Sequence, residues 1–478
     1  MLVEKVRQST QLGKQEGNIS MRQEKDSLGI FNIPDNAYYG VQTARALENF
    51  PISGIKADSD FIKASVFIKK AAAKVNSELG QIDKKISDVI ISACDEVLNG
   101  SLADNFVVDV YQAGAGTSHN MNVNEVLANR AIELLGGTKG DYKLLSPNDH
   151  VNCAQSTNDF FPTAMRLAAL IKSSELLKAL DICSKTLAQK ATEFSPIIKA
   201  GRTHLQDAVP VRLGREFEVY SNIFRDHKSR IENAINELKV LGIGGTAAGT
   251  GLNAHPQYQS KIVTELSNLL GTNLQGASDL MLAMQSMAPF VAVSSAIKNF
   301  ALDLTKVCND LRLMDSGPTS GLSEIKLPAV QPGSSIMPGK INPSMIEMVN
   351  QICFQVIGCS STIEYSSQAG QFELNVMMPV INYNLLHSMR ILTNALVIWN
   401  EKCLKGITAN SDRCKEYAQK SVSNATALNP LLGYLKTAEV VKEALATGKT
   451  IEQVCLEQNL VEANKLKEVL DLEKQVGK

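Results

Sequence analysis

Long stretches with the apolar periodicity of an α-helix occupy the middle of the chain and constrain its fold most. Residues 286–314 and 344–359 are each richer in apolar side chains than a surface helix needs. A third stretch, from Gly214 to Leu241, carries apolar side chains at Phe217, Tyr220, Phe224, Ile231, Ile235, Leu238 and Leu241, with charges between them. A helix that is apolar nearly all round must be covered on all sides. The sequence therefore predicts a mainly α fold, with a long central helical bundle whose outer faces pack on other subunits.

The pattern also predicts how the chain divides into domains. A length of 478 residues is compatible with about three domains. The helical periodicity is interrupted by polar, Asn-rich loops near 146–158 and 405–412. We expect an N-terminal tail, an N-terminal domain, a central helical domain and a small C-terminal domain of short helices, over residues 1–26, 27–157, 158–410 and 411–478.

Charge and composition exclude several classes of protein. The 48 Lys and Arg residues balance 49 Asp and Glu residues, so no nucleic-acid partner or anionic membrane surface is expected. Residues 1–26 lack the apolar segment of a signal peptide. The uncharged run Leu280–Ile297 is interrupted by polar residues and a proline, which predicts a helix buried in protein and not in lipid.

The cysteines and histidines indicate an intracellular protein without a structural metal. The nine cysteines are dispersed and form no Cys-x-x-Cys pair, which is typical of reduced, buried thiols. The six histidines show no metal-ligand spacing. We therefore expect a cytoplasmic protein with no metal site.

Four polar segments stand out against the apolar helical background. They are residues 114–125, 155–159, 201–208 and 333–343. The first combines glycines with hydroxyls ahead of a helix, a layout that suits an anion, although helix capping alone also explains it. The second, Gln155–Asp159, can likewise cap a helix or bind a carboxylate. The third contains His204, flanked by hydroxyl, amide and carboxylate side chains.

The fourth segment, Gly333–Pro343, is the most informative. It holds two adjacent serines, a lysine and an asparagine among glycines and prolines, which favour a loop. Such a loop can hold a carboxylate and present a hydroxyl as a nucleophile or base. Taken alone, such a loop is more often a polar connector.

Together these segments favour a small dicarboxylate substrate and no cofactor. They supply neutral donors, hydroxyls and two candidate cations, Lys340 and a protonated His204. The Gly-rich stretch 242–251 follows a predicted helix and not a strand, so it lacks the context of a dinucleotide or phosphate loop.

At this level of detail the sequence resembles the aspartase/fumarase superfamily. The loop 333–343 resembles its signature, segments 114–129, 147–159 and 201–208 resemble its other blocks, and the resemblance runs from about Asp26 to the end. It implies a homotetramer with a central helical bundle and active sites built from three subunits. Gln155–Asp159, Ala37–Thr43 and Ala369–Asn375 are similar to the ammonia-lyase branch, and Ser146 stands where class II fumarases have His.

The resemblance also implies a reaction and residue roles. The reaction is the reversible deamination of L-aspartate to fumarate and ammonia through an enediolate. Ser334 aligns with the general base, and His204, the second candidate catalytic residue, lies near the α-carboxylate. Asn158 contacts the amino group. The β-carboxylate is bound by Thr117, Ser156, Thr157 and Ser335, and the α-carboxylate by Thr203, Lys340 and Asn342.

Three points stay open at the level of sequence. Fumarate hydratase, which adds water in place of ammonia, is the nearest alternative, and a non-catalytic structural protein on the same fold is a more distant one. Thr319 and Met378 depart from the family pattern, outside the residues to which it assigns substrate contacts. His119 is unusual in its block and was a further candidate to touch the site.

Overall fold

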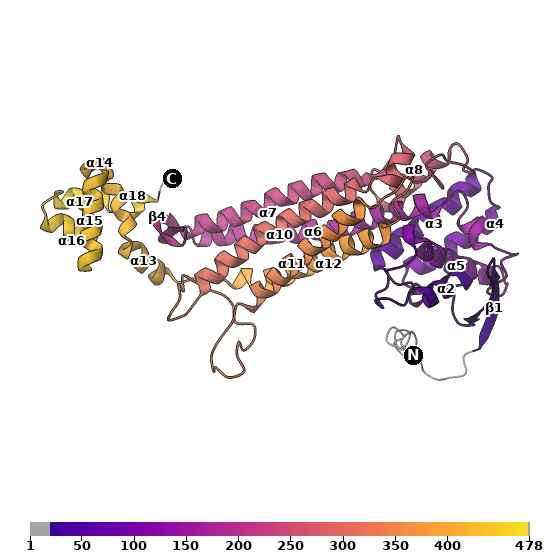
Figure 1. The fold of residues 1–478 in the computed structure, drawn as a ribbon, viewed down its shortest axis with the longest axis horizontal. Helices are drawn as coiled ribbons and strands as arrows, with labels where there is room; N and C mark the ends of the chain where they lie inside the picture. Colours follow the sequence, from indigo (N-terminus) through magenta and orange to yellow (C-terminus); the bar gives the residue numbers. More distant parts are fainter. Residues whose placement is uncertain (1–19, 477–478) are drawn as a thin grey trace. The chain divides into compact units, whose positions relative to one another are not determined.

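The computed structural model describes residues 20–476 and confirms a mainly α fold (Figure 1). The chain divides into two compact units, each made of three segments. Unit 1 comprises Met1–Leu177, Arg230–Asn299 and Gln355–Ile391, and unit 2 comprises Lys178–Ser229, Phe300–Phe354 and Leu392–Lys478. Of the predicted tail, residues 1–19 lie outside the described residues, and Met21–Asp26 form strand β1. The predicted domain boundaries stay a prediction.

Unit 1 is built around a packed layer of helices. Its core joins α3, α4 and α5 through fully buried side chains such as Val66, Ile90 and Val123. The elements that lie wholly in unit 1 are β1 (Met21–Asp26), β2 (Gly29–Pro34), α2 (Val41–Asn49), α3 (Ser59–Glu78), α4 (Lys84–Leu98), α5 (Thr117–Leu134), β5 (Val240–Leu241), α8 (Tyr258–Leu270), β6 (Gln275–Gly276) and α9 (Leu280–Gln285). Strands β1 and β2 form an antiparallel pair, and β5 pairs in parallel with β6.

Unit 2 combines a β-hairpin with a cluster of short C-terminal helices. The hairpin strands β3 and β4 pair in antiparallel fashion, and β7 pairs with β8 in the same way. The elements that lie wholly in unit 2 are β3 (Ile198–Thr203), β4 (Gln206–Arg212), β7 (Ile325–Lys326), β8 (Thr408–Ala409), α13 (Ser411–Lys420), α14 (Asn429–Leu432), α15 (Tyr434–Thr447), α16 (Ile451–Glu457), α17 (Ala463–Val469) and α18 (Leu472–Gln475). Buried Leu428, Val440 and Val454 belong to the core of the short helices.

The division between the units falls inside the long helices that apolar periodicity predicts. These are α6 (Thr157–Glu193), α7 (Leu213–Asn236), α10 (Ala288–Asp315), α11 (Ser344–Ser367) and α12 (Met378–Lys402). The periodic residues are buried as expected: Phe224, for example, is fully buried and contacts the rings of Phe300 and Trp399 at centroid distances of 5.0 and 6.1 Å. Helix α7 ends earlier than the pattern suggested, because Val240 and Leu241 form a strand.

Two other sequence expectations are wrong. The Gly-rich stretch 242–251 follows the two-residue strand β5 and not a helix directly, although a single 3₁₀ turn, Glu237–Lys239, precedes that strand. The uncharged run Leu280–Ile297 is not one helix: α9 ends at Gln285 and α10 begins at Ala288. Within residues 20–476, no helix combines the length and apolar character that crossing a membrane requires.

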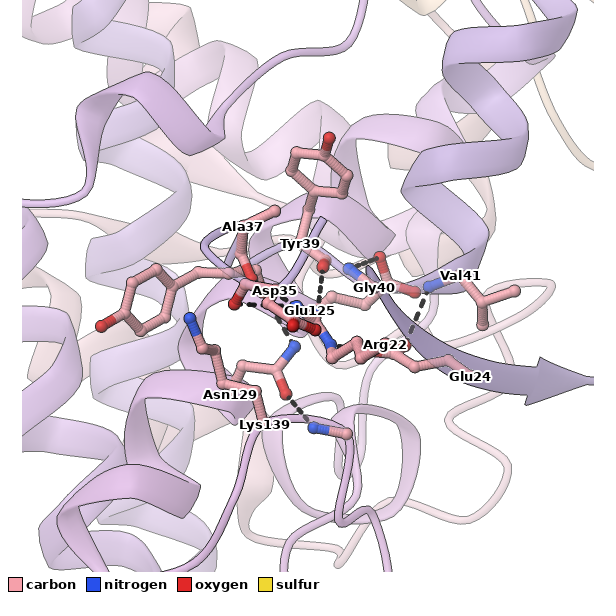
Figure 2. Close-up of polar contacts among 12 residues, drawn as sticks. Arg22, Glu24, Asp35, Ala37, Tyr39, Gly40, Val41, Glu125, Asn129 and Lys139 are labelled. Atoms are coloured by element: carbon pink, nitrogen blue, oxygen red, sulfur yellow. Dashed lines mark hydrogen bonds and ion pairs between the residues drawn. The ribbon is translucent and has the colours of Figure 1, made fainter. Parts of the chain in front are cut away.

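The start of α2 shows how buried carboxylates shape unit 1. Glu125 on α5 accepts a hydrogen bond from the Gly40 N–H at 2.8 Å, and Glu24 on β1 accepts one from the Val41 N–H at 3.0 Å (Figure 2). Negative charge suits this position because the first N–H groups of a helix lack partners within it. Arg22 donates to backbone carbonyls of the same segment, and burial raises the pKa of Glu125 to about 7. The Ala37–Thr43 block is thus a structural junction.

Candidate active site

The sequence-predicted site residues fall into three groups. Thr117, Ser156, Thr157 and Asn158 belong to unit 1 and lie at the first turns of α5 and α6. Unit 2 carries the other two groups, one on the β3–β4 hairpin and one on the loop 333–343. Among the described residues, no hydrogen bond joins the hairpin group to the loop group.

The start of α6 presents three polar side chains in fixed orientations. The Ser156 Oγ accepts from the Asn158 N–H at 3.2 Å, so it caps the helix as the simpler interpretation expected. The Thr157 Oγ1 accepts from the Asn120 Nδ2 at 3.0 Å. Because both hydroxyl oxygens act as acceptors within the protein, both hydroxyl protons remain free to donate to a ligand. Capping and ligand binding are therefore compatible here.

Asn158 is oriented by the Gly-rich stretch. Its Nδ2 donates to the carbonyl of Ala247 at 2.8 Å, which leaves Oδ1 available as an acceptor for a ligand amine. The buried carboxylate of Asp159 accepts from the N–H groups of Gly244 and Thr246, both at 2.9 Å. The backbone of Gly244 and Thr246 thus holds the start of α6.

Thr117 is the first residue of α5 and is exposed. The preceding Gly116 has φ +86°, and a Cβ at that position would lie 2.1 Å from ring atoms of Phe161. Only glycine meets both conditions, because other residues rarely adopt this φ and would also clash. The tight turn at Gly116 therefore places the Thr117 hydroxyl at the helix N-terminus, where unpaired N–H groups attract anions.

His204 and Thr203 lie at the tip of the β3–β4 hairpin. The turn residues His204 and Leu205 have φ of +54° and +58°, as in a type I′ turn, which normally uses Asn or Gly. Neither residue prefers this conformation, and Leu205 is 72% exposed. Such a conformation costs about 1–3 kcal/mol for each residue and persists only where the surrounding structure imposes it. The turn holds the exposed His204 and Thr203 at the tip of the hairpin.

A buried ion network anchors this hairpin. The Glu324 side chain is fully buried, and its two oxygens lie 2.9 Å from the Lys199 Nζ and 2.9 Å from the Arg202 Nη1. Lys199 also pairs with Glu216 at 3.1 Å. Burial opposes the charge of Lys199, but the nearby carboxylates of Glu216 and Glu324 raise its pKa overall. The base of the hairpin is therefore held by charged contacts around a fully buried carboxylate, with Arg202 and Glu216 partly exposed at the edge of the network.

The loop 333–343 is closed on itself by hydrogen bonds. The Gly333 N–H donates to the Lys340 carbonyl at 2.8 Å, and the Asn342 Nδ2 donates to the Gly333 carbonyl at 2.6 Å. A Cβ at position 333 would lie 2.5 Å from the Lys340 carbonyl oxygen, so the closure requires glycine. Lys340 and Ser335 are exposed, whereas Ser334 is half-buried.

Within this loop, backbone N–H groups point at the Ser334 hydroxyl. The Ser334 Oγ accepts from the N–H of Ile336 at 3.2 Å and from the N–H of Met337 at 3.0 Å. Two donors on one oxygen stabilise its ionised form more than its neutral form. These contacts are compatible with an ionised hydroxyl at Ser334.

His119 does not join these donor groups. It is almost fully buried, with its ring stacked on Phe61 at a centroid distance of 4.5 Å and its Nε2 2.9 Å from the Ser65 Oγ. Burial lowers its pKa to about 3, so it is neutral near pH 7. Met378 is also fully buried, at the start of α12.

Sequence reasoning missed the buried residues behind the start of α6. Lys69 and Asn120 lie there, and neither has more than 1% exposure. Lys69 stands next to Lys70, and two adjacent lysines are usually a solvated surface. The available signal was its spacing from Phe61, Ser65 and Ala72, which places it on the apolar face of α3.

Comparison with known proteins identifies the family of the chain. A family model described as "Lyase" matches residues 29–358, and one described as "Fumarase C C-terminus" matches residues 425–476. The chain is 49% identical over 454 residues to an aspartate ammonia-lyase of Bacillus sp, covering 95% of this chain and 97% of that one. It is 46% identical to the aspartate ammonia-lyase of Escherichia coli (strain K12), covering 95% and 96%.

Solved structures are similar over nearly the whole chain. A fumarate lyase:delta crystallin from Brucella melitensis, bound to cobalt, has a TM-score of 0.93 and 45% identity, covering 96% of this chain and all of that one. A class II fumarase from Schistosoma mansoni has a TM-score of 0.92 and 36% identity, covering 96% and 99%. The chain therefore belongs to the aspartase/fumarase superfamily of lyases.

Proposed function

We propose that the chain is an aspartate ammonia-lyase, which converts L-aspartate reversibly to fumarate and ammonia. The observation that carries the mechanism is the pair of backbone N–H groups, from Ile336 and Met337, that point at the Ser334 Oγ. The relatives of nearly half identity over almost the full length carry the choice of reaction.

Ser334 acts as the general base in this proposal. Its alkoxide takes a proton from the β-carbon of aspartate, and the electron pair of the C–H bond moves into the β-carboxylate to give an enediolate. The pair then forms the double bond of fumarate while the C–N bond breaks and the substrate ammonium leaves as ammonia. The two N–H groups lower the cost of the alkoxide, since charge-assisted hydrogen bonds are the stronger kind.

The donors on α5 and α6 stabilise the enediolate. Thr117, Ser156 and Thr157 donate to the β-carboxylate, with Ser335 from the loop. This carboxylate gains charge as the proton leaves, so donors aimed at it favour the transition state over the ground state. The free hydroxyl protons of Ser156 and Thr157 are consistent with this role.

The remaining residues hold the other end of the substrate. Thr203, Lys340 and Asn342 bind the α-carboxylate, with His204 beside it, and the Oδ1 of Asn158 accepts from the substrate ammonium. In this structure the Asn342 Nδ2 closes the loop onto Gly333, so a second N–H of the same amide has to serve the substrate. A loop closed in this way suits a lid over the bound substrate.

A homotetramer in the cytoplasm is part of the proposal. Several large apolar side chains on the long helices are exposed in the single chain, among them Phe354 at 59%, Tyr365 at 72% and Leu302 at 52%. Exposed apolar side chains of this size favour burial against another subunit. Light scattering on the purified protein tests the assembly, and four copies per particle are expected.

Replacing Ser334 by alanine tests the mechanism. We expect Ser334→Ala to lose fumarate formation from L-aspartate, followed by ultraviolet absorption, while it still binds succinate. Ser92→Ala, on the exposed surface of α4, is the matched control and should keep full activity. Near-normal turnover of Ser334→Ala would remove Ser334 from the role of base. Loss of fumarate that does not depend on added ammonium would favour a fumarate hydratase.

A further inference from the structure

Lys69 is a buried lysine whose contacts differ from those of other buried lysines in the chain. Lys172 pairs with Asp58 and Asp60, and Lys199 pairs with Glu216 and Glu324. Lys69 is fully buried on α3, yet its three contacts are the neutral oxygens of Asn120, Asn152 and Gln155, at 2.9, 3.0 and 2.9 Å. Among the described residues, no carboxylate lies within ion-pair distance of its Nζ.

An ammonium that water does not reach needs compensation for its lost hydration. Three amide oxygens and the face of Phe160, whose ring centroid lies 3.9 Å from the Nζ, supply part of it. Burial lowers the pKa of Lys69 well below its ordinary value, although the nearby charge of Asp159 opposes this. The carboxylate of Asp159 is occupied with the N–H groups of Ser156, Gly244 and Thr246. The charge of Lys69 is therefore compensated only in part by its neutral neighbours.

A chain of two hydrogen bonds links Lys69, through Asn120, to the hydroxyl of Thr157. Lys69 donates to the Oδ1 of Asn120, and this contact fixes the orientation of the amide, with Oδ1 towards Lys69 and Nδ2 towards Thr157. The Nδ2 of Asn120 then donates to the Oγ1 of Thr157 at 3.0 Å. Because Thr157 already accepts one hydrogen bond, its hydroxyl proton is directed elsewhere.

We propose that Lys69 is a positioning residue for the β-carboxylate site, which acts through Asn120 to hold Thr157 as a donor and whose charge stabilises the extra negative charge of the enediolate. This inference rests on the proposed function, since it assigns Thr157 to the β-carboxylate. It predicts that Lys69 favours the charged intermediate over the bound substrate. A lysine with only a structural role would affect both equally.

Two binding probes separate these possibilities. Succinate carries two ordinary carboxylates and reports on binding of the ground state. The nitronate form of 3-nitropropionate carries its extra charge on two oxygens at the β-carboxylate position, as the enediolate does. Both affinities are measured by calorimetry on the intact protein, with kcat and KM for L-aspartate measured in parallel.

The test variant is Lys69→Met, which keeps the length of the side chain and removes the charge. We expect its nitronate affinity and its kcat to fall by about tenfold or more, because one lost electrostatic contact to an oxyanion has at least this effect. Its succinate affinity and KM should change by less than about threefold, as expected for interactions made mainly in the transition state. Lys70→Met is the matched control, because Lys70 forms a partly exposed pair with Asp95, and it should leave all four quantities unchanged.

Asn120→Ala provides a second route if Lys69→Met does not fold. It removes the link between Lys69 and Thr157 and should give the same preferential loss of nitronate binding. Equal losses for both probes, or no loss, in whichever variant folds would overturn the role of Lys69. If the variant shows the preferential loss of nitronate binding but the unmodified protein makes no fumarate from L-aspartate, the reaction is wrong while the role of Lys69 stands. If the unmodified protein binds neither probe, both proposals fail.

Discussion

The ion network beneath the hairpin makes a quantitative prediction for Glu324→Gln. The substitution keeps the size of a fully buried side chain and removes the charge that faces Lys199 and Arg202. Breaking a buried pair by removing one partner typically costs about 3–5 kcal/mol. Lys199 keeps Glu216 at 3.1 Å, and the Arg202 side chain, at 17% exposure, can gain contact with water. We therefore expect Glu324→Gln to lower the free energy of unfolding by about 3 kcal/mol, near the lower end of this range.

Urea unfolding measures this loss, and hydrogen exchange at the amides of β3 and β4 locates it. Exchange of these amides should accelerate, because the charged contacts hold the base of the hairpin. Glu218→Gln is the matched control: Glu218 pairs with Arg215 on the surface, with both side chains more than half exposed, and its loss should stay below about 1 kcal/mol. Equal losses in the two variants, or a loss below about 1 kcal/mol for Glu324→Gln, would refute the assignment of a buried network.

Three further predictions follow from other contacts. Gly116→Ala should destabilise unit 1 by about 2 kcal/mol or more, because the alanine Cβ would overlap the Phe161 ring and φ at this position is unfavourable for alanine. Thermal unfolding measures the loss, and an unchanged melting temperature would contradict it. The pKa of Lys199 is raised in the folded state, so this lysine stabilises the fold fully below its ordinary pKa of 10.5. The stabilisation is lost as the pH rises through the raised folded pKa. In unfolding curves measured over a pH series, Lys199→Met should not show this loss of stability at alkaline pH. Eight of the nine thiols are buried, and Cys153 is partly buried with a pKa that burial raises. A thiol reagent should therefore react slowly with the native protein and titrate nine thiols in urea. Rapid reaction of several thiols in the native protein would contradict this burial.

The sequence predicted the long helices well because their apolar residues repeat with a fixed period. Phe217, Tyr220 and Phe224 are all buried on α7, as the pattern requires. The β3–β4 hairpin was not predicted, because His204 and Leu205 occupy turn positions that usually carry Asn or Gly. Periodicity says little about a turn that tertiary contacts such as those of Glu324 impose on residues with other preferences.

The candidate site was predictable only where its residues are crowded along the chain. Ser334 and Lys340 lie in one polar loop, and Ser156 and Thr157 are neighbours, so their unusual composition was visible. Lys69 was not recognisable as a site residue, since its partners Asn120 and Gln155 are 51 and 86 residues away along the chain. A buried charge is recognised from contacts across the fold, which a single sequence does not state.

The hydrogen bonds between the Gly-rich stretch and the start of α6 have a consequence for protein engineering. Asp159 and Asn158 are tied to the backbone of Gly244, Thr246 and Ala247, so small shifts in that backbone are passed to the neighbouring hydroxyls. Libraries that vary residues 244–247 would therefore shift the turn at the start of α6, which the proposal assigns to the substrate, without altering any side chain proposed to bind it. We expect some substitutions in this stretch to change the preference among amino-acid substrates, although the substituted residues do not themselves contact the substrate.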